Sequence, residues 1–340
     1  MQLDTTAHSD PTIAVCGTGS IGFRHLRVIR ERLHGRAVGV PIRSSRHDEL
    51  RQSGYEAYAR IANAAQAGCR MAIIATDTNR HLRDAHEAIL AGCDLLIEKP
   101  IAPGINGLQE LWTAADHSGC RIWVGCNLRF NTGLQLFRRR LPEIGQIHGV
   151  HIECQSYLPD WRPNRDYRCS YSSRADDGGV LRDLIHEIDY AVWLFGRPQS
   201  VFAMLLNLGR LSIEAEETVD LFWQAKAGYG VSIHLDYLNR IPRRSIRAQG
   251  DRGDIEWDFV RQRLVVALAS KESEEIPVLQ DRDDMMADQT AAFVQAIRTG
   301  ISGDLATFDE GAFAVALCEA ARHSAASGAA ETIPDWRLSS

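Results

Sequence analysis

The chain has 340 residues, enough for about two domains, and its 45% hydrophobic and 24% charged residues are typical of a globular protein. The net charge of -6 excludes a broad attraction to nucleic acid or to an anionic membrane, and no stretch approaches the roughly twenty apolar residues that span a bilayer. Residues 1–10 lack the apolar core of a signal sequence and predict a flexible tail.

The eight cysteines are scattered and include no Cys-x-x-Cys pair. We therefore expect free thiols in a reducing cytoplasm, and no metal site. The dipeptide His186-Glu187 begins like a zinc-protease motif, but position 190 is a tyrosine where that motif has its second histidine.

The first predicted elements are a strand at residues 13–16, a glycine-rich turn and a helix from residue 21 to residue 33. This order and the spacing Gly17-x-Gly19-x-x-Gly22 fit a dinucleotide-binding fingerprint. Gly17 would allow the tight turn, Gly19 the approach of a pyrophosphate, and Gly22 close packing of the helix on its strand. Because a helix N-terminus attracts phosphate, we expect the cofactor to bind at Gly17, Gly19, Ser20, Ile21 and Gly22.

The second predicted strand, at residues 37–42, leads into Arg43, Ser44, Ser45 and Arg46. Rossmann proteins that bind NAD usually carry an Asp or Glu near this point, where it binds the ribose 2′-hydroxyl. Two guanidinium groups and two hydroxyls suit a 2′-phosphate instead, and no carboxylate is there to repel it. We therefore predict that NADP(H) is preferred and that NAD(H) is possible, with an ordinary polar loop as the alternative.

Strands and helices then alternate up to residue 130, which predicts a doubly wound parallel sheet in a Rossmann domain over residues 11–127. We expect helices at residues 47–53, 81–91 and 108–118, and strands at residues 71–76, 94–97 and 121–125. Ligands of such sheets bind at the carboxyl ends of the strands. Polar residues expected at that edge, and so at the cofactor, are Thr76, Asn79, His81, Glu98, Lys99 and Asn127.

The pattern changes after about residue 147, where strand-like stretches follow one another with few helices between them. We expect strands at residues 150–155, 200–207, 218–223, 231–237, 244–248 and 264–267, a helix at residues 179–195, and a closing helical region at residues 285–327. This predicts an α+β substrate-binding and oligomerisation domain over residues 128–340, with a large, open, mostly antiparallel sheet.

Three groups of residues could carry chemistry. Lys99 follows a strand at the ligand edge and could bind or protonate a substrate hydroxyl; a surface lysine is the alternative. Asp183 and His186 are three residues apart and would share a helix face, which makes a plausible acid/base pair. The alternative there is a core histidine whose partner is Asp189.

The third group is the loop that begins at Tyr157 and runs to Arg174, which is rich in aromatic residues and arginines. Aromatic rings stack on sugars, and arginines pair with phosphate or carboxylate groups. We expect substrate contacts from Tyr157, Trp161, Tyr167 and Arg168; a loop that docks only on its own domain is the alternative.

Together these motifs resemble the Gfo/Idh/MocA oxidoreductase family over roughly residues 12–327. The resemblance rests on five stretches, at residues 17–22, 75–81, 98–100, 125–130 and 178–189. It implies a Rossmann domain, an open-sheet domain that forms dimers or tetramers, and hydride transfer between a sugar or cyclitol carbon and a nicotinamide. By the same resemblance Lys99 and His186 are catalytic, and we expect Arg129 to contact the substrate. The family's usual aspartate falls on Arg182, so Asp183 takes that place only if the helix is shifted by one residue.

The sequence thus predicts a cytoplasmic NAD(P)-dependent dehydrogenase or reductase of a sugar derivative, with Lys99, His186 and Asp183 as its catalytic residues. We expect the substrate to be an amino sugar, a nucleotide sugar or a cyclitol, and the protein to be a homodimer or homotetramer through the open sheet. The alternatives are a dinucleotide-binding sensor or scaffold without activity, and a redox-cycling glycosidase or lyase that holds its NAD(P) tightly.

Overall fold

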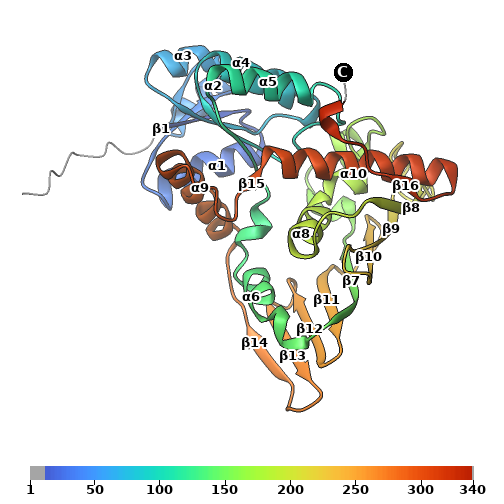
Figure 1. Ribbon diagram of the computed structural model, residues 1–340. Helices are drawn as coiled ribbons and strands as arrows, with labels where there is room; N and C mark the ends of the chain where they lie inside the picture. The colour runs from blue at the N-terminus through green and yellow to red at the C-terminus, as the bar shows by residue number, and fades with distance from the viewer. Residues whose placement is uncertain (1–11, 339–340) are drawn as a thin grey trace, which may run out of the picture.

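The computed structural model describes residues 12–338, so the predicted tail at residues 1–10 lies outside the described residues. Within the described range the elements form two sheets joined by the helix α10 (Phe308–Ser327), which contacts β6 of the first sheet and β8 of the second (Figure 1). The mixed α/β fold with a parallel and a mostly antiparallel sheet confirms the predicted fold class.

The first sheet has the order β15-β6-β5-β4-β1-β2-β3 within residues 12–338, and its neighbours pair in parallel except for β15. Its strands are β1 (Thr12–Cys16), β2 (Arg36–Val40), β3 (Glu56–Ala57), β4 (Met71–Ile74), β5 (Asp94–Ile97), β6 (Ile122–Val124) and β15 (Ala306–Thr307). The near-continuous apolar runs in β1, β4 and β5 are buried because helices cover both faces of the sheet.

The helices of this first layer are α1 (Ser20–Glu31), α2 (Arg46–Gln52), α3 (Ile61–Gln66), α4 (His81–Leu90), α5 (Leu108–Ser118) and α9 (Arg282–Thr299). The helices α1 and α9 pack on one face of the sheet, and α3, α4 and α5 pack on the other (Figure 1). The division of the chain between residues 127 and 128 stays a proposal. Two elements that follow residue 128 in the sequence, α9 and β15, belong to the first sheet and its covering layer.

The second sheet has the order β14-β13-β12-β11-β7-β10-β9-β8-β16 in the described part of the chain, and its pairs are antiparallel except for β7 with β10. Its strands are β7 (Ile147–Gln155), β8 (Ser200–Leu206), β9 (Thr218–Gln224), β10 (Gly230–Asp236), β11 (Arg243–Gly250), β12 (Gly253–Asp258), β13 (Arg263–Leu268), β14 (Glu274–Pro277) and β16 (Glu331–Thr332). The strands β12 and β14 were not predicted, because acidic residues interrupt their apolar pattern.

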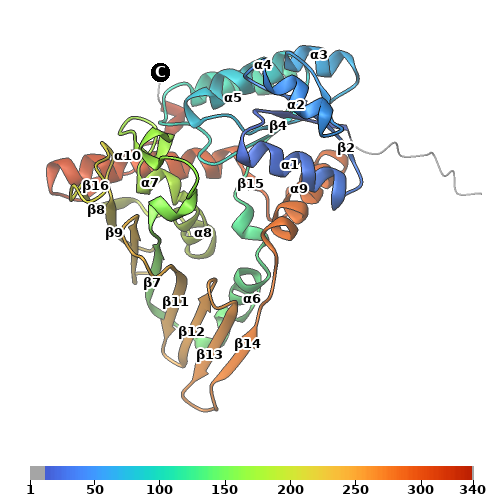
Figure 2. The same ribbon diagram turned by 180° about the vertical axis from the view of Figure 1, so that it is seen from behind.

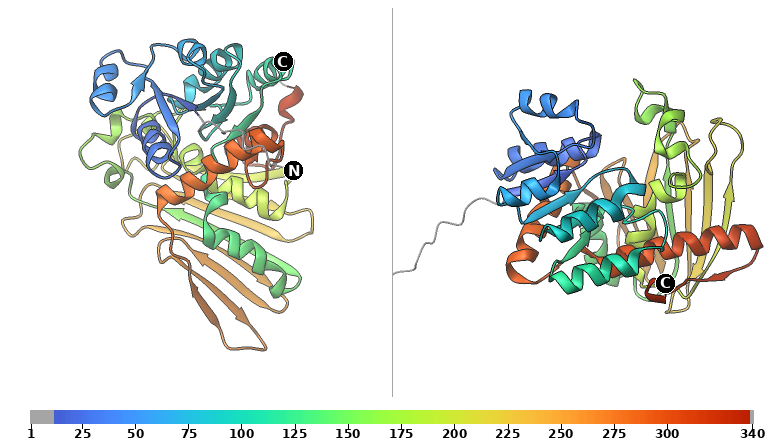
Figure 3. Two further views of the ribbon diagram at one scale, coloured as in Figure 1. Left: turned by 90° about the vertical axis from the view of Figure 1, so that its left-hand side faces the viewer. Right: turned by 90° about the horizontal axis from the view of Figure 1, so that it is seen from above.

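One face of the second sheet carries α6 (Thr132–Arg140), α7 (Val180–Asp183), α8 (Ile185–Phe195) and α10 (Figures 2 and 3). The strand β7 shows why, since Val150, Ile152 and Cys154 are buried and His151 and Glu153 alternate with them. On the opposite face, Phe202 and Phe222 are exposed. The sheet is therefore open on one side, as the alternation predicts.

The predicted helix at residues 179–195 is wrong as a single element, because it breaks at Leu184, whose φ of -99° and ψ of 30° are not helical. The broken stretch lies between the two sheets and brings Asp183 and His186 to the site described next.

Candidate active site

The glycine turn after β1 has the geometry that a dinucleotide requires. Gly17 has a φ of +84°, and a Cβ added to it would lie 2.5 Å from the Ala75 carbonyl oxygen. A Cβ on Gly22 would lie 1.8 Å from the Gly17 carbonyl oxygen, so both positions need glycine. A Cβ on Gly19 would meet nothing within 4 Å, which leaves open space where the backbone can face a ligand.

The start of α1 also suits a phosphate. Gly19 is its N-cap and provides no side-chain cap, and no acidic residue stands in the first turn, which begins with Ser20 and Ile21. Thr18 and Thr76 follow the neighbouring strands β1 and β4, and their buried hydroxyls have no hydrogen-bond partner among the described residues. Unpartnered donors beside an uncapped helix fit a phosphate-bearing cofactor.

The arginine and serine cluster lies just past β2, as the sequence predicts. Arg43, Ser44 and Ser45 are exposed, and the Arg46 Nε atom is 3.4 Å from a carboxylate oxygen of Glu49. No ion pair engages Arg43 within residues 12–338. This side chain is therefore available to an anionic ligand.

A cavity of about 1280 Å³ lies between the two sheets. It brings together five side chains that the sequence predicts for the site: Lys99, Asn127, Trp161, Asp183 and His186. The second sheet and the start of α9 supply much of the remaining wall, including Gln155, Arg243, Arg244, Phe259 and Arg282. The sequence did not point to these residues.

Lys99 projects from the end of β5 toward the second sheet. Its Nζ atom donates a hydrogen bond of 2.6 Å to the backbone oxygen of Asp183. In a continuous helix that oxygen would accept from the amide of Glu187, which instead donates to Leu184. At the break between α7 and α8, Lys99 therefore donates to the Asp183 oxygen the hydrogen bond that the Glu187 amide would donate in a continuous helix.

The expected pairing of Asp183 with His186 is wrong. The Asp183 carboxylate accepts a hydrogen bond of 2.5 Å from the Tyr237 hydroxyl, and the residue is buried. Because the helix breaks at Leu184, Asp183 and His186 do not share a helix face. The aspartate therefore orients the backbone that holds Lys99.

His186 lies in the cavity wall, and its Nδ1 atom is buried without a partner among the described residues. Burial, together with the charges of Lys99 and Arg244, holds the pKa of His186 well below its usual value. The imidazole is therefore neutral near pH 7 and can accept a proton. Its expected alternative partner, Asp189, is bound to another residue.

That other residue is Arg129, and its predicted role in substrate binding is wrong. Arg129 is 2% exposed, and its guanidinium donates to both carboxylate oxygens of Asp189 at 2.9 and 2.6 Å. A third hydrogen bond, of 3.1 Å, reaches Glu310. Arg129 thus ties η2 (Asn127–Phe130) to α8 and α10, a structural role.

His81, predicted to bind the cofactor, is also structural. The side chain is buried, with its Nδ1 atom 2.9 Å from the Pro100 oxygen and its Nε2 atom 3.1 Å from the Thr76 oxygen. It thus joins the loops that follow β4 and β5. Asn79 is exposed in η1 (Thr78–Arg80) beside it.

Glu98, a further predicted cofactor residue, pairs with the fully buried His25 at 2.7 Å. Burial works to raise the pKa of Glu98, but the hydrogen bond to His25 and the charge of Lys99 lower it overall. The carboxylate therefore anchors α1 to the end of β5.

Of the loop residues predicted for the substrate, only Trp161 lines the cavity. Its Nε1 atom donates to the Ser156 hydroxyl at 2.9 Å, and its ring meets Tyr237 edge-on. Tyr157 instead lies under the guanidinium of Arg240, which also donates to the Tyr157 hydroxyl at 3.0 Å.

The expected substrate contacts of Tyr167 and Arg168 do not fit the structure, since neither lines the cavity. The Tyr167 hydroxyl donates to the Leu211 oxygen, and Arg168 is exposed and pairs with Asp166. This part of the loop docks on its own domain, which was the alternative.

Arg244 is the residue that the sequence reasoning missed most clearly. Its Nε atom is 2.8 Å from a carboxylate oxygen of Glu187, which is fully buried. Burial raises the pKa of Glu187, and the charge of Arg244 opposes that rise. A signal existed, because Arg244 precedes the apolar Ile246 and Ala248 at the two-residue spacing of one strand face.

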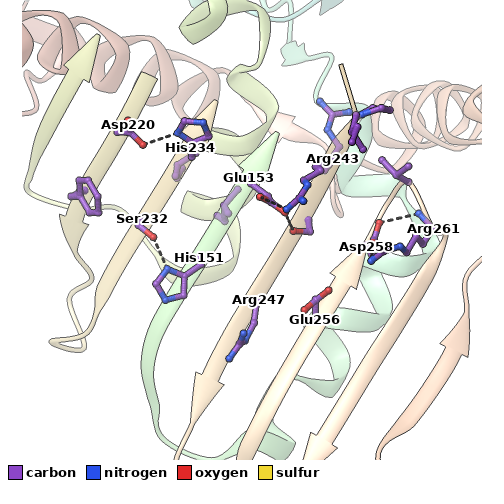
Figure 4. A pocket seen from close by; sticks show the side chains of 18 residues that line it. His151, Glu153, Asp220, Ser232, His234, Arg243, Arg247, Glu256, Asp258 and Arg261 are labelled. Carbon is purple, nitrogen blue, oxygen red and sulfur yellow. Dashed lines mark hydrogen bonds and ion pairs between the residues drawn. The ribbon is translucent and has the colours of Figure 1, made fainter. Parts of the chain in front are cut away.

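A second hollowed region lies on the open face of the second sheet (Figure 4). His234 is there 2.7 Å from Asp220 and 3.3 Å from Asp236, and His151 bonds to Ser232 at 2.8 Å. The region holds none of the predicted catalytic residues.

Two family models match the chain and together cover most of it. Residues 12–126 match an oxidoreductase family with an NAD-binding Rossmann fold, and residues 141–256 match a GFO/IDH/MocA C-terminal domain. A myo-inositol dehydrogenase, Hyg17, of Streptomyces leeuwenhoekii is 27% identical over 55% of this chain and 56% of its own. An NADP(+)-linked scyllo-inositol 2-dehydrogenase, IolW, of Bacillus subtilis is 29% identical over 45% and 41%. The chain therefore spans about half the length of these relatives, or less.

Solved structures match along nearly the whole chain, at low sequence identity. A levoglucosan dehydrogenase in complex with NADH and L-sorbose has a TM-score of 0.83 at 19% identity, over 96% of this chain and 100% of that one. An inositol dehydrogenase homolog of Azotobacter vinelandii complexed with NAD+ has a TM-score of 0.84 at 16% identity, over 96% and 98%. These likenesses establish the fold. Within residues 12–338, no helix has the length and apolar character needed to cross a membrane.

Proposed function

The chain belongs to the Gfo/Idh/MocA oxidoreductase family, and from that premise we propose that it is a nicotinamide-dependent dehydrogenase or reductase of a sugar or cyclitol derivative. The observation that carries the proposal is that Lys99 and His186, which are 87 positions apart in the sequence, line one cavity between the two sheets. An ammonium donor beside a neutral imidazole is a suitable pair for moving the proton of a hydroxyl group.

The residues that would hold the cofactor are the glycine turn, the uncapped start of α1 and the hydroxyls of Thr18 and Thr76. When it is bound, the nicotinamide supplies the hydride donor or acceptor. The amide of Asn127 lies in the cavity wall and could hydrogen-bond either the cofactor or the substrate.

The proposed catalytic step divides between two side chains. Lys99, held by the Asp183 oxygen at 2.6 Å, donates a hydrogen bond to the substrate oxygen and stabilises the negative charge that develops on it. In the direction of oxidation a ring nitrogen of His186 accepts the hydroxyl proton, and in the direction of reduction the imidazolium returns it. Because its pKa is lowered, His186 is unprotonated near pH 7, which is the form that can accept a proton.

We also propose that NADP(H) is preferred, on the support of the Arg43 to Arg46 cluster. In a binding titration, NADPH should bind more tightly than NADH. Arg43→Gln should weaken NADPH binding about tenfold and leave NADH binding unchanged, since it removes one charge-assisted contact with the 2′-phosphate. Arg51→Gln, an exposed change near the far end of the helix α2 that follows Arg43, is the matched control. Equal or tighter binding of NADH to the unmodified protein would contradict the preference.

The open face of the second sheet supports a further proposal, a homodimer or homotetramer. Phe202, Met204 and Phe222 are exposed there. Phe222 lines the hollowed region, and Phe202 and Met204 lie on the adjacent strand β8. An apolar patch of this kind on a sheet favours contact with a second copy. Light scattering on a sizing column should give a mass of at least twice the chain's 37.8 kDa, and a monomer at micromolar concentration would contradict it.

The activity itself is tested by incubating the protein with NADP+ or NADPH and a panel of nucleotide sugars, amino sugars, cyclitols and their keto forms. The proposal predicts a change in the absorbance of reduced nicotinamide with at least one member. Tight cofactor binding without any turnover would favour a sensor or scaffold. Release of a glycosidic product without net change in the cofactor would favour a redox-cycling glycosidase or lyase.

A further inference from the structure

Two guanidinium groups share one aromatic ring in the wall of the cavity. Arg244 lies 5.6 Å and Arg282 lies 6.0 Å from the centre of the Phe259 ring, and all three residues line the cavity that holds Lys99 and His186. The Arg244 guanidinium is paired with Glu187. The Arg282 guanidinium has no ion pair or hydrogen bond among the residues that the structure describes, where it contacts the Phe259 ring.

The missing partner of Arg282 is notable because carboxylates lie close to it in the sequence. Asp283 pairs with Arg24 at 3.0 Å and with Arg27 at 2.5 Å, both on α1. Carboxylate oxygens of Asp281 and Asp284 lie 4.0 and 3.6 Å from the guanidinium of Arg32, the C-cap residue of α1. The ion pairs of these three acidic neighbours are with arginines of α1 and its C-cap and none is with Arg282, although Asp281 and Asp284 also line the cavity.

The electrostatic surroundings of Arg282 are unfavourable to a cation. Arg282 is the first residue of α9, where the positive end of the helix dipole disfavours a further positive charge. Arg282 is exposed to solvent, and the desolvation that it does undergo, then the charges of Arg244 and Arg24, lower the pKa of its guanidinium. An anion in the cavity would relieve this repulsion, and a planar guanidinium is the side chain that best holds carboxylate or phosphate oxygens.

We propose that Arg282, assisted by Arg244, forms an anion subsite, so that the substrate is a sugar or cyclitol bearing a carboxylate or a phosphate group. This proposal rests on the proposed function, because it places the anionic group in the cavity that holds Lys99 and His186. The anion pairs with the Arg282 guanidinium, which forms no ion pair with a carboxylate of the described chain. Arg282 is exposed, so water solvates its charge when a neutral sugar is bound, and an anionic group is favoured by the charge-assisted hydrogen bond that it adds.

The test measures binding to the full chain loaded with NADP+, by calorimetry, so that it does not depend on turnover. One arm compares glucuronate and galacturonate with glucose and galactose, and a second arm compares glucose 6-phosphate and myo-inositol 1-phosphate with glucose and myo-inositol. At least one anionic compound should bind ten or more times as tightly as its neutral counterpart. The arm in which this occurs identifies the anionic group as carboxylate or phosphate.

Arg282→Gln should abolish the advantage of the anionic compound, and Arg282→Lys should keep part of it. Arg298→Gln, an exposed change at the other end of α9, is the matched control and should keep all of it. Thermal unfolding of each variant shows whether it is folded, and the affinity of Arg282→Gln for NADPH should be unchanged.

The proposal is wrong if no anionic compound binds more tightly than its neutral counterpart, or if Arg282→Gln keeps the difference. It is also wrong if Arg282→Gln loses NADPH affinity to the same extent, since the arginine would then serve the cofactor. Anion binding that depends on Arg282 without any redox turnover would support the subsite and count against the dehydrogenase. Equal oxidation of neutral and anionic sugars would support the dehydrogenase and overturn the subsite.

Discussion

The helix α8 contributes to two charged clusters, one through Asp189, which pairs with Arg129, and one through His186, which lies near Lys99 and Arg244. The two clusters differ in how their charges are compensated. Around Arg129, each charged group has an opposite partner, with two hydrogen bonds to Asp189 and one to Glu310. Around His186 the neighbouring cations are Lys99, which donates to a backbone oxygen, and Arg244, which pairs with Glu187. Arg282 beyond them has no carboxylate partner in the described chain.

The difference teaches how a charged residue can be assigned to structure or to function. A buried charge is costly unless it is paired, so the cluster at Arg129 is needed simply to keep that region folded. The cluster at His186 lines a cavity, so a bound ligand can supply negative charge that the protein does not. Removing a charge should therefore cost stability in the first cluster and ligand binding or turnover in the second.

The largest effect on stability is expected for Arg129→Met. It leaves Asp189 buried without its partner, which should lower the free energy of unfolding by about 3–5 kcal/mol. Arg138→Met is the matched control, because Arg138 stacks on the same ring, that of Trp193, but pairs with Asp304 at the surface. The control should lose about 1 kcal/mol or less in urea denaturation. Equal losses in both variants would remove the distinction between the clusters.

A double variant sharpens the same comparison. Arg129→Met combined with Asp189→Leu replaces the buried ion pair by apolar groups, which proteins often tolerate. It should be more stable than Arg129→Met alone, by about 1 kcal/mol or more. If the double variant is less stable than the single one, the cost lies in packing and not in the unpaired Asp189 charge.

The smallest effect concerns His234, an intermediate case in which two carboxylates hold a partly exposed imidazole (Figure 4). The hydrogen bond to Asp236, with that to Asp220, raises the pKa of His234 to about 9, against the opposing effect of burial. Its contribution to stability is complete below the unfolded pKa of about 6.5 and is lost as the pH rises through about 9.

The measurement is the free energy of unfolding between pH 6 and pH 10. The unmodified protein should lose about 1 kcal/mol or less over this range through His234, because solvent screens the pair. His234→Gln should flatten that part of the profile. His151→Gln, which affects a histidine bonded to a serine and not to a carboxylate, should leave it unchanged. Identical profiles for His234→Gln and the unmodified protein would contradict the assignment.

The sequence predicted the wall of the site that comes from the first sheet because parallel strands follow a positional rule. The carboxyl ends of β1, β5 and β6 meet at one edge, so the turn at Gly17, Lys99 and Asn127 could be assigned to one region before any coordinates were known. The same rule places a residue at this edge of the sheet but does not give the orientation of its side chain. His81 and Arg129 lie at that edge and are nevertheless turned into the protein, His81 toward the Pro100 carbonyl and Arg129 toward the Asp189 carboxylate.

The wall from the second sheet could not be predicted in this way, because an open antiparallel sheet has no edge at which ligands regularly bind. At the helix break, the Asp183 oxygen accepts its hydrogen bond from Lys99, which is 84 positions away. Arg282 reaches the cavity only because α9 returns to pack on α1. Both features arise from contacts between distant segments, and helical spacing alone predicted the wrong partner for His186.

The central claim is that Lys99 acts on the substrate and is not needed to hold the cofactor or the fold. Its most direct test is Lys99→Ala, with turnover, NADPH affinity and the free energy of unfolding measured on the same preparation, and with Lys226→Ala, an exposed change between β9 and β10, as the control. The account predicts a loss of kcat of about 10²- to 10³-fold with NADPH affinity and stability nearly unchanged, and no effect in the control. Full turnover by Lys99→Ala would contradict it.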